Sequence, residues 1–83
     1  FFMRRKDLKI DDIYVPVKRR ATRNQQTVEA LAAAILEDGQ KVPIQVRQDG
    51  ERLILIEGLH RLEACRALGE DTVLGILVRA RLH

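Results

Sequence analysis

The chain has 83 residues, enough for one domain and too few for a second, and 46% of them are hydrophobic. Aromatic residues make up only 4%, so the core must be built from aliphatic side chains. Residues 1–23 carry eight Lys and Arg against three Asp, whereas residues 24–83 carry seven against nine acidic residues. This basic N-terminal quarter favours a polyanionic partner, nucleic acid or nucleotide, although a solvated basic arm would have the same composition.

Several classes of protein are excluded by what the sequence lacks. Cys65 is the one cysteine, which excludes an internal disulfide and fits a reducing cytoplasm. No apolar segment approaches the ~20 residues of a membrane span, and residues 1–3 do not begin a signal peptide. His60 and His83 have no ligand spacing with Cys65, so no metal site is expected. Tyr14 alone offers no aromatic platform for single-stranded nucleic acid.

The first quarter of the chain predicts an arm and a short strand region. We expect a basic N-terminal arm over residues 1–7 and one folded domain over residues 8–83. Apolar residues alternate over 8–17 and predict one or two short strands, which Pro16 closes because it lacks a backbone donor. A polar connector over 18–23 follows.

Two helices and three further strands are expected beyond this connector. Asn24 is a plausible N-cap for a helix with apolar residues at i, i+3, i+4 and i+7, which ends at Asp38-Gly39. A second helix spans residues 59–68. The strands are 43–47, 53–56 and 73–78, with an Asp-Gly turn joining the first two into a hairpin. The order β-α-β-β-α-β predicts an α+β domain with one mixed sheet and two main helices.

The most informative stretch is residues 56–61, where a strand meets the second helix. Gly58 allows a sharp turn and a close approach to a ligand, and the first amides of the helix are unpaired beside the positive end of its dipole. His60 and Arg61 add side-chain donors, so the stretch predicts a phosphate site. The predicted contacts are Gly58, Leu59, His60 and Arg61. The alternative is that Gly58 makes a tight turn and Arg61 pairs with Glu57 or Glu63.

Residues 53–69, followed by Asp71-Thr72-Val73, closely resemble the signature of the ParB/sulfiredoxin superfamily. Residues 30–47 are similar to the helix, loop and strand that precede this signature, and residues 8–17 to its opening strand, so the resemblance covers residues 8–79. It implies the small fold of the ParB-like N-terminal domain, in which the glycine motif binds nucleotide phosphates. The implied cofactor is a nucleoside triphosphate, ATP or CTP, with Mg²⁺.

The same resemblance gives the basic stretch a role. Lys18, Arg19, Arg20 and Arg23 lie where ParB-like proteins carry basic residues that face nucleotide or DNA. Guanidinium forks match phosphate oxygens, so we expect Arg20 and Arg23 to close over the phosphates. An exposed basic loop is the alternative. The resemblance implies DNA and nucleotide as partners, allows a homodimer, and points to bacterial chromosome or plasmid partition or to transcription regulation.

Two positions depart from the superfamily pattern. Leu59 stands where sulfiredoxins carry their catalytic cysteine, and Cys65 falls about two turns later on the apolar line of the helix. Sulfiredoxin-type reductase activity is therefore not expected. Val42 stands where ParB proteins usually carry a glutamine associated with reading cytosine, so CTP is not specified over ATP.

Glu57 is the one candidate catalytic residue. In the free serine kinase branch of this superfamily, the acidic residue before the glycine motif takes part in phosphoryl transfer, where a carboxylate acts as base or holds a metal ion. A strand-end glutamate that pairs with Arg61 is the alternative. The features favour a nucleotide- and DNA-associated binding module over an enzyme that uses Glu57. A structural, partner-binding domain remains the third possibility.

Overall fold

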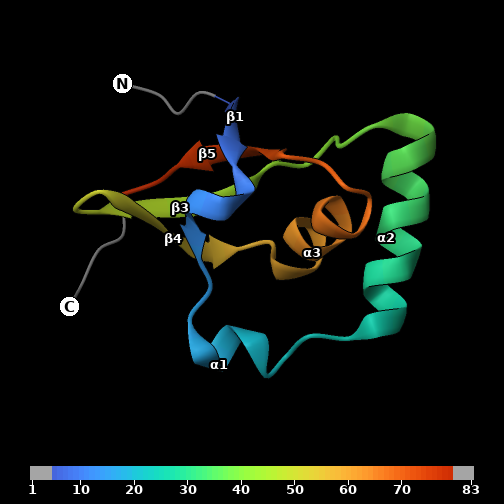
Figure 1. Ribbon diagram of the computed structural model, residues 1–83, viewed down its shortest axis with the longest axis horizontal. Coiled ribbons are helices and arrows are strands. Elements are labelled where there is room, and N and C mark those ends of the chain that lie inside the picture. Colours follow the sequence, from blue (N-terminus) through green and yellow to red (C-terminus); the bar gives the residue numbers. More distant parts are fainter. Residues whose placement is uncertain (1–4, 80–83) are drawn as a thin grey trace.

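The computed structural model describes residues 5–79 and confirms an α+β domain with one mixed sheet and two main helices (Figure 1). In chain order the elements are β1 (Arg5–Lys9), the 3₁₀ turn η1 (Ile10–Asp12), β2 (Ile13–Tyr14), α1 (Val17–Arg20), α2 (Gln25–Asp38), β3 (Ile44–Asp49), β4 (Arg52–Glu57), α3 (Leu59–Ala67) and β5 (Thr72–Leu77). The two main helices and the strands predicted over 43–47, 53–56 and 73–78 are therefore present, with ends within about two residues of their expected positions. The strand region predicted over 8–17 is also present, but it begins three residues earlier and ends three residues earlier than expected.

The sheet has the strand order β1-β5-β3-β4-β2. The β3–β4 and β1–β5 pairs are antiparallel, whereas β3–β5 and β2–β4 are parallel. Strand β1 begins at Arg5, which pairs with Ile76. Residues 5–7 of the expected arm over 1–7 thus belong to the sheet, because their backbone groups find partners on β5, and residues 1–4 lie outside the described residues.

The connector expected over residues 18–23 begins with a helical turn. Pro16 precedes α1, and its carbonyl accepts hydrogen bonds from the amides of Arg19 and Arg20 at 2.9 and 3.1 Å. No apolar period marks these four residues, because they have no buried face. The turn has a consequence for function, since successive side chains on a helix point in directions about 100° apart.

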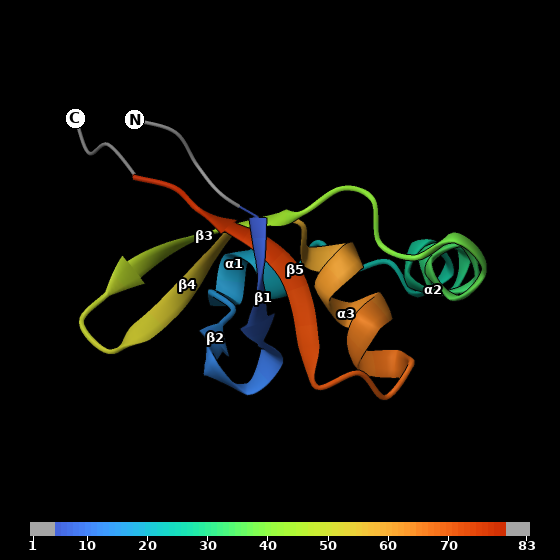
Figure 2. The same cartoon turned by 90° about the horizontal axis from the view of Figure 1, so that it is seen from above.

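Helix α3 lies on the sheet, and α2 packs on the outer side of α3 (Figure 2). The core joins Leu59, Leu62 and Cys65 of α3 to aliphatic residues of the strands, including Ile44 and Leu55. Helix α2 buries one residue, Val28, and leaves Leu36 76% exposed. The core of the domain is thus formed between the sheet and α3.

Gln40 joins the loop after α2 to the sheet. Its Oε1 accepts a hydrogen bond from the amide of Leu74 at 2.7 Å, and its Nε2 donates to the carbonyls of Leu74 and Val42 at 2.9 Å each. Strand β3 begins at Ile44, which is in register with Gly75 on β5. The Gln40 side chain therefore extends the pairing of β3 with β5 by one residue. It provides hydrogen-bond partners for the amide and the carbonyl of Leu74, which the backbone of β3 does not reach.

Gly58 brings the start of α3 into contact with β3. It has φ 105° and ψ 30°, a left-handed conformation that favours glycine. A Cβ at this position would lie 2.7 Å from Cγ2 and 3.1 Å from Cα of Ile44, whose side chain is fully buried. Position 58 therefore has no room for the side chain of any other residue.

Replacing Gly58 with alanine should destabilise the domain more than the same change at Gly69. Gly69 also has a positive φ of 80°, but a Cβ there would meet nothing within 4 Å. Gly69→Ala should cost about 1–2 kcal/mol for the left-handed backbone alone. Gly58→Ala should add about 1–3 kcal/mol of overpacking against Ile44. Urea unfolding of the two variants measures the difference, and equal losses would contradict a close contact at Gly58.

Candidate functional site

The start of α3 presents three backbone amides. The carbonyl of Gly58 accepts the first hydrogen bond of the helix, from the amide of Leu62 at 3.0 Å. No side chain caps the helix, and among residues 5–79 the amides of Leu59, His60 and Arg61 have no acceptor. Such amides, at the positive end of the helix dipole, suit an anion. The Leu59 side chain belongs to the core, so its amide is the group that faces the site.

A hollow of about 510 Å³ surrounds this helix start, and we call it the α3-start hollow. Its lining combines residues of two stretches that are distant in sequence, 19–31 and 57–61: Arg19, Thr22, Thr27, Leu31, Glu57, Gly58, Leu59, His60 and Arg61. The structure thus brings the whole predicted glycine motif together with Glu57 and Arg19. Thr22 and Thr27 were not predicted, because the sequence does not show that the loop before α2 passes the start of α3.

Glu57 pairs with Arg19 rather than with Arg61. The distance from Glu57 Oε1 to Arg19 Nη1 is 3.4 Å, and the two side chains are 66% and 44% exposed. An ion pair this exposed contributes little to stability. It does determine the local charge, because an anion that binds Arg19 must compete with the Glu57 carboxylate.

His60 links the start of α3 to the start of α2. Its Nε2 accepts a hydrogen bond from the amide of Asn24 at 3.0 Å. Asn24 is the N-cap of α2, as predicted, and its Oδ1 accepts from the amide of Thr27 at 3.1 Å. A ring nitrogen that accepts carries no proton, so the proton of neutral His60 is assigned to Nδ1. His60 therefore has one remaining donor and a positioning role that the sequence did not reveal.

Arg20 and Arg23 do not line the α3-start hollow, in contrast to the prediction that they close over its phosphates. Arg20 Nε donates to the carbonyl of Val15 at 3.0 Å, and Arg23 Nε lies 3.3 Å from Glu63 Oε1. Both line a second hollow, of about 520 Å³. For Arg20 the physical reason is the helical turn of α1, which sends Arg19 and Arg20 in different directions. Arg23 lies beyond α1 and is directed to the second hollow by its contact with Glu63. Lys18 is exposed and lines neither hollow.

Cys65 is a core residue, as its position on the apolar line predicted. It is 3% exposed, and burial raises the pKa of its thiol, with the Glu70 carboxylate acting in the same direction. A thiol held in its protonated form is a poor nucleophile. Since Leu59 occupies the start of the helix, the α3-start hollow contains no cysteine.

Within residues 5–79, no three His, Cys, Asp or Glu side chains gather as metal ligands. The same part of the chain contains no helix that is both long and apolar enough to cross a membrane.

Comparison with known proteins identifies the family. The family model described as the ParB N-terminal domain matches residues 3–82. The chain belongs to this family. No curated protein matches the sequence.

Solved structures share the fold of this ParB N-terminal domain. Sulfiredoxin from Arabidopsis thaliana superposes with a TM-score of 0.83 at 27% identity, over 93% of this chain and 86% of that one. Truncated ParB from Caulobacter crescentus bound to the centromeric parS site gives 0.73 at 27% identity, over 89% and 40%. The same protein with CTP-γ-S gives 0.79 at 23%, over 93% and 45%. The chain thus spans less than half the length of these ParB chains.

Two substitutions at His60 test its link to Asn24. In His60→Gln the amide oxygen reaches the place of Nε2, whereas in His60→Asn the side chain reaches only the place of Nδ1. We expect His60→Gln to keep the bond to the Asn24 amide and His60→Asn to lose it, at a cost of about 1 kcal/mol. Urea unfolding and the amide signals of Asn24 and Thr27 measure this. Indistinguishable variants would show that the bond does not hold α2.

Proposed function

We propose that this ParB N-terminal domain binds the phosphates of a nucleoside triphosphate, ATP or CTP, and associates with DNA as part of a partition or transcription-regulating system. The observation that carries the proposal is the set of three amides at the start of α3 that have no acceptor within the described part of the chain, inside a hollow that Arg19 and Arg61 also line. Amides fix the place of an anion, and guanidinium groups supply the charge that a triphosphate requires.

The individual residues divide this work. Gly58 permits the close approach of the backbone, and Leu59, His60 and Arg61 provide the amides. Arg61 adds its side chain, and His60 adds Nδ1–H. Mg²⁺ would arrive with the triphosphate, since this ion usually keeps its waters and substrate phosphates as ligands and takes few from the protein.

The relatives support this proposal without extending to every part of it. The Caulobacter crescentus ParB structures contain CTP-γ-S in one case and the parS site in the other. Nucleotide and DNA are thus ligands of proteins with this fold, and we propose both as ligands of this chain. The basic stretch supports the DNA part, since it places Lys18, Arg19, Arg20 and Arg23 on α1 and the loop after it. A homodimer is compatible with the same role.

One observation favours a second candidate function, phosphoryl transfer or nucleotide hydrolysis. Glu57 lies directly before Gly58, lines the same hollow and is 66% exposed in its side chain. A carboxylate beside bound phosphate can act as a base. The contact of Glu57 with Arg19 is equally compatible with a role in which the Glu57 carboxylate only neutralises the charge of Arg19. A third role is partner binding without nucleotide. The close contact between Gly58 and Ile44 supports it, because packing alone would then explain why a glycine is required at position 58.

Nucleotide binding should be visible at the start of α3. Titration of the labelled chain with ATP or CTP and Mg²⁺ should shift the amide signals of residues 58–61. Arg61→Gln should weaken binding about tenfold, because it removes a charge-assisted hydrogen bond. If these amides do not respond to either nucleotide, the proposed site is wrong.

Glu57→Gln separates the binding module from the enzyme. For a binding module, this variant should bind nucleotide more tightly, because the competing carboxylate is lost and Arg19 becomes available. Neither form should release phosphate above the background rate. For an enzyme, wild-type protein should release phosphate or form ADP, and Glu57→Gln should abolish this activity while it still binds.

A further inference from the structure

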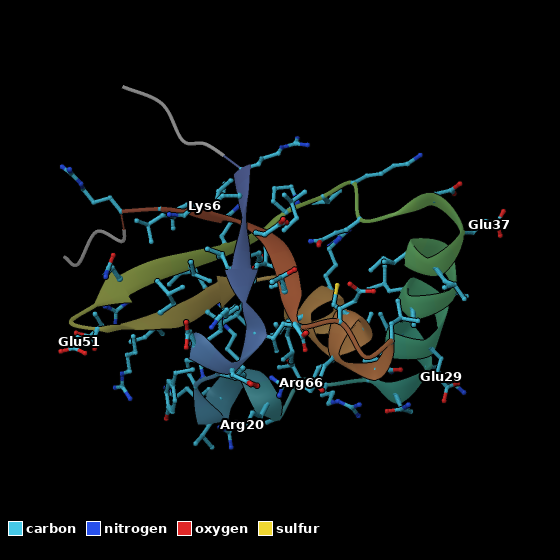
Figure 3. All side chains as sticks on the ribbon, turned by 45° about the horizontal axis from the view of Figure 1, so that its top comes forward. Lys6, Arg20, Glu29, Glu37, Glu51 and Arg66 are labelled. Carbon is cyan, nitrogen blue, oxygen red and sulfur yellow. The ribbon has the colours of Figure 1, made fainter. Side chains whose placement is uncertain are left out.

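The second hollow gathers three arginines that come from two parts of the chain. Arg20 ends α1, Arg23 lies in the loop after it, and Arg66 lies near the end of α3. Figure 3 labels Arg20 and Arg66, whose side chains lie near each other in that view. The lining residues of this hollow and those of the α3-start hollow have no member in common. We call it the arginine hollow.

Each of these arginines is oriented through its inner nitrogen. Nε of Arg20 donates to the carbonyl of Val15 at 3.0 Å, and Nε of Arg23 and of Arg66 lie 3.3 and 3.8 Å from the two oxygens of Glu63. Among residues 5–79, the terminal nitrogens of the three guanidinium groups donate no hydrogen bond to another protein group. Contacts with the protein therefore orient the three guanidinium groups, and their outer N–H groups remain available to bind a ligand.

The charges and walls of the hollow favour an anion. Three guanidinium groups face two carboxylates, of Glu63 and Asp11. Glu63 is only 21% exposed in its side chain, and both its oxygens already have arginine partners. The Arg20 guanidinium also lies 6.0 Å from the centre of the Tyr14 ring, a cation–π distance. Glu63 thus acts chiefly as an internal support for two of the arginines.

We propose that the arginine hollow is a second phosphate-binding site, separate from the start of α3, which takes a phosphate group through the outer nitrogens of Arg20, Arg23 and Arg66. Paired guanidinium N–H groups match phosphate oxygens in geometry as well as in charge. This inference deepens the proposed function, the binding of nucleotide and DNA, and rests on it. The phosphate belongs to a DNA backbone or to a free nucleotide, sources that share this chemistry.

Three charge-matched variants of the chain test the site. Arg66→Gln removes one guanidinium from the arginine hollow, and Arg61→Gln removes one from the α3-start hollow. Arg47→Gln is the control, because Arg47 lies on β3 and lines neither hollow. The probes are a short DNA duplex at low salt, ATP with Mg²⁺, and inorganic phosphate. The readouts are DNA affinity as a function of salt and the Nε–H signals of the arginines.

Arg66→Gln should weaken the binding of its phosphate source about tenfold, and Arg47→Gln should change it far less. If the source is DNA, the salt dependence should also fall by about one phosphate contact, and the duplex alone should shift the Nε–H signal of Arg66. If the source is a free phosphate, ATP or inorganic phosphate should shift that signal.

The proposal is overturned if Arg66→Gln and Arg47→Gln behave alike with all three probes, or if the wild-type chain binds none of them. Its failure can be told from a failure at the start of α3. That site is followed by the amides of residues 58–61 and by Arg61→Gln, whereas this one is followed by the arginine side chains and by Arg66→Gln.

Discussion

The contact between Gly58 and Ile44 is the constraint from which the rest of the site follows. Because position 58 has no Cβ, the chain can leave β4, turn in a left-handed conformation and place α3 directly against β3. Gly58 is itself the N-cap residue of α3, so the N-cap position has no side chain that could cap the helix. Packing and phosphate binding are therefore compatible explanations of this glycine. The close contact demands glycine, and the same absence of a side chain leaves the amides uncapped.

Helix α2, which follows the basic stretch, is held by polar contacts at both ends as well as by packing on α3. It fully buries Val28, and Ile35 packs partly buried against the core. Its start is joined to α3 by the bond from Asn24 to His60, and the loop after its end is joined to β5 by Gln40. Each of these bonds involves a backbone group that would otherwise lack a protein partner. The position of the loop over the α3-start hollow thus depends on a residue of the glycine motif itself.

The sequence predicted the elements with a strong local pattern. Asn24 caps α2, the Asp-Gly turn joins β3 to β4, and the apolar line through Leu59, Leu62 and Cys65 lies in the core. The directions of charged side chains were not predictable in this way. Glu57 lies beside Arg19, which is 38 residues away in the chain, and no local pattern encodes that contact. For the same reason, the sequence did not show that Arg20 and Arg23 line a different hollow from the glycine motif.

Glu57 of the α3-start hollow and Glu63 of the arginine hollow differ in a way that favours different anions. Glu57 is exposed and holds Arg19 through a single contact of 3.4 Å, so an incoming anion must displace it. A triphosphate, with several charges and the α3 amides to bind, can compete successfully with one solvated carboxylate. Glu63 is more buried and engages two arginines through both oxygens, so displacing it would leave a poorly solvated charge. An anion in the arginine hollow must instead add to the outer nitrogens. That arrangement suits a singly charged phosphodiester, which requires no rearrangement of the network beneath it.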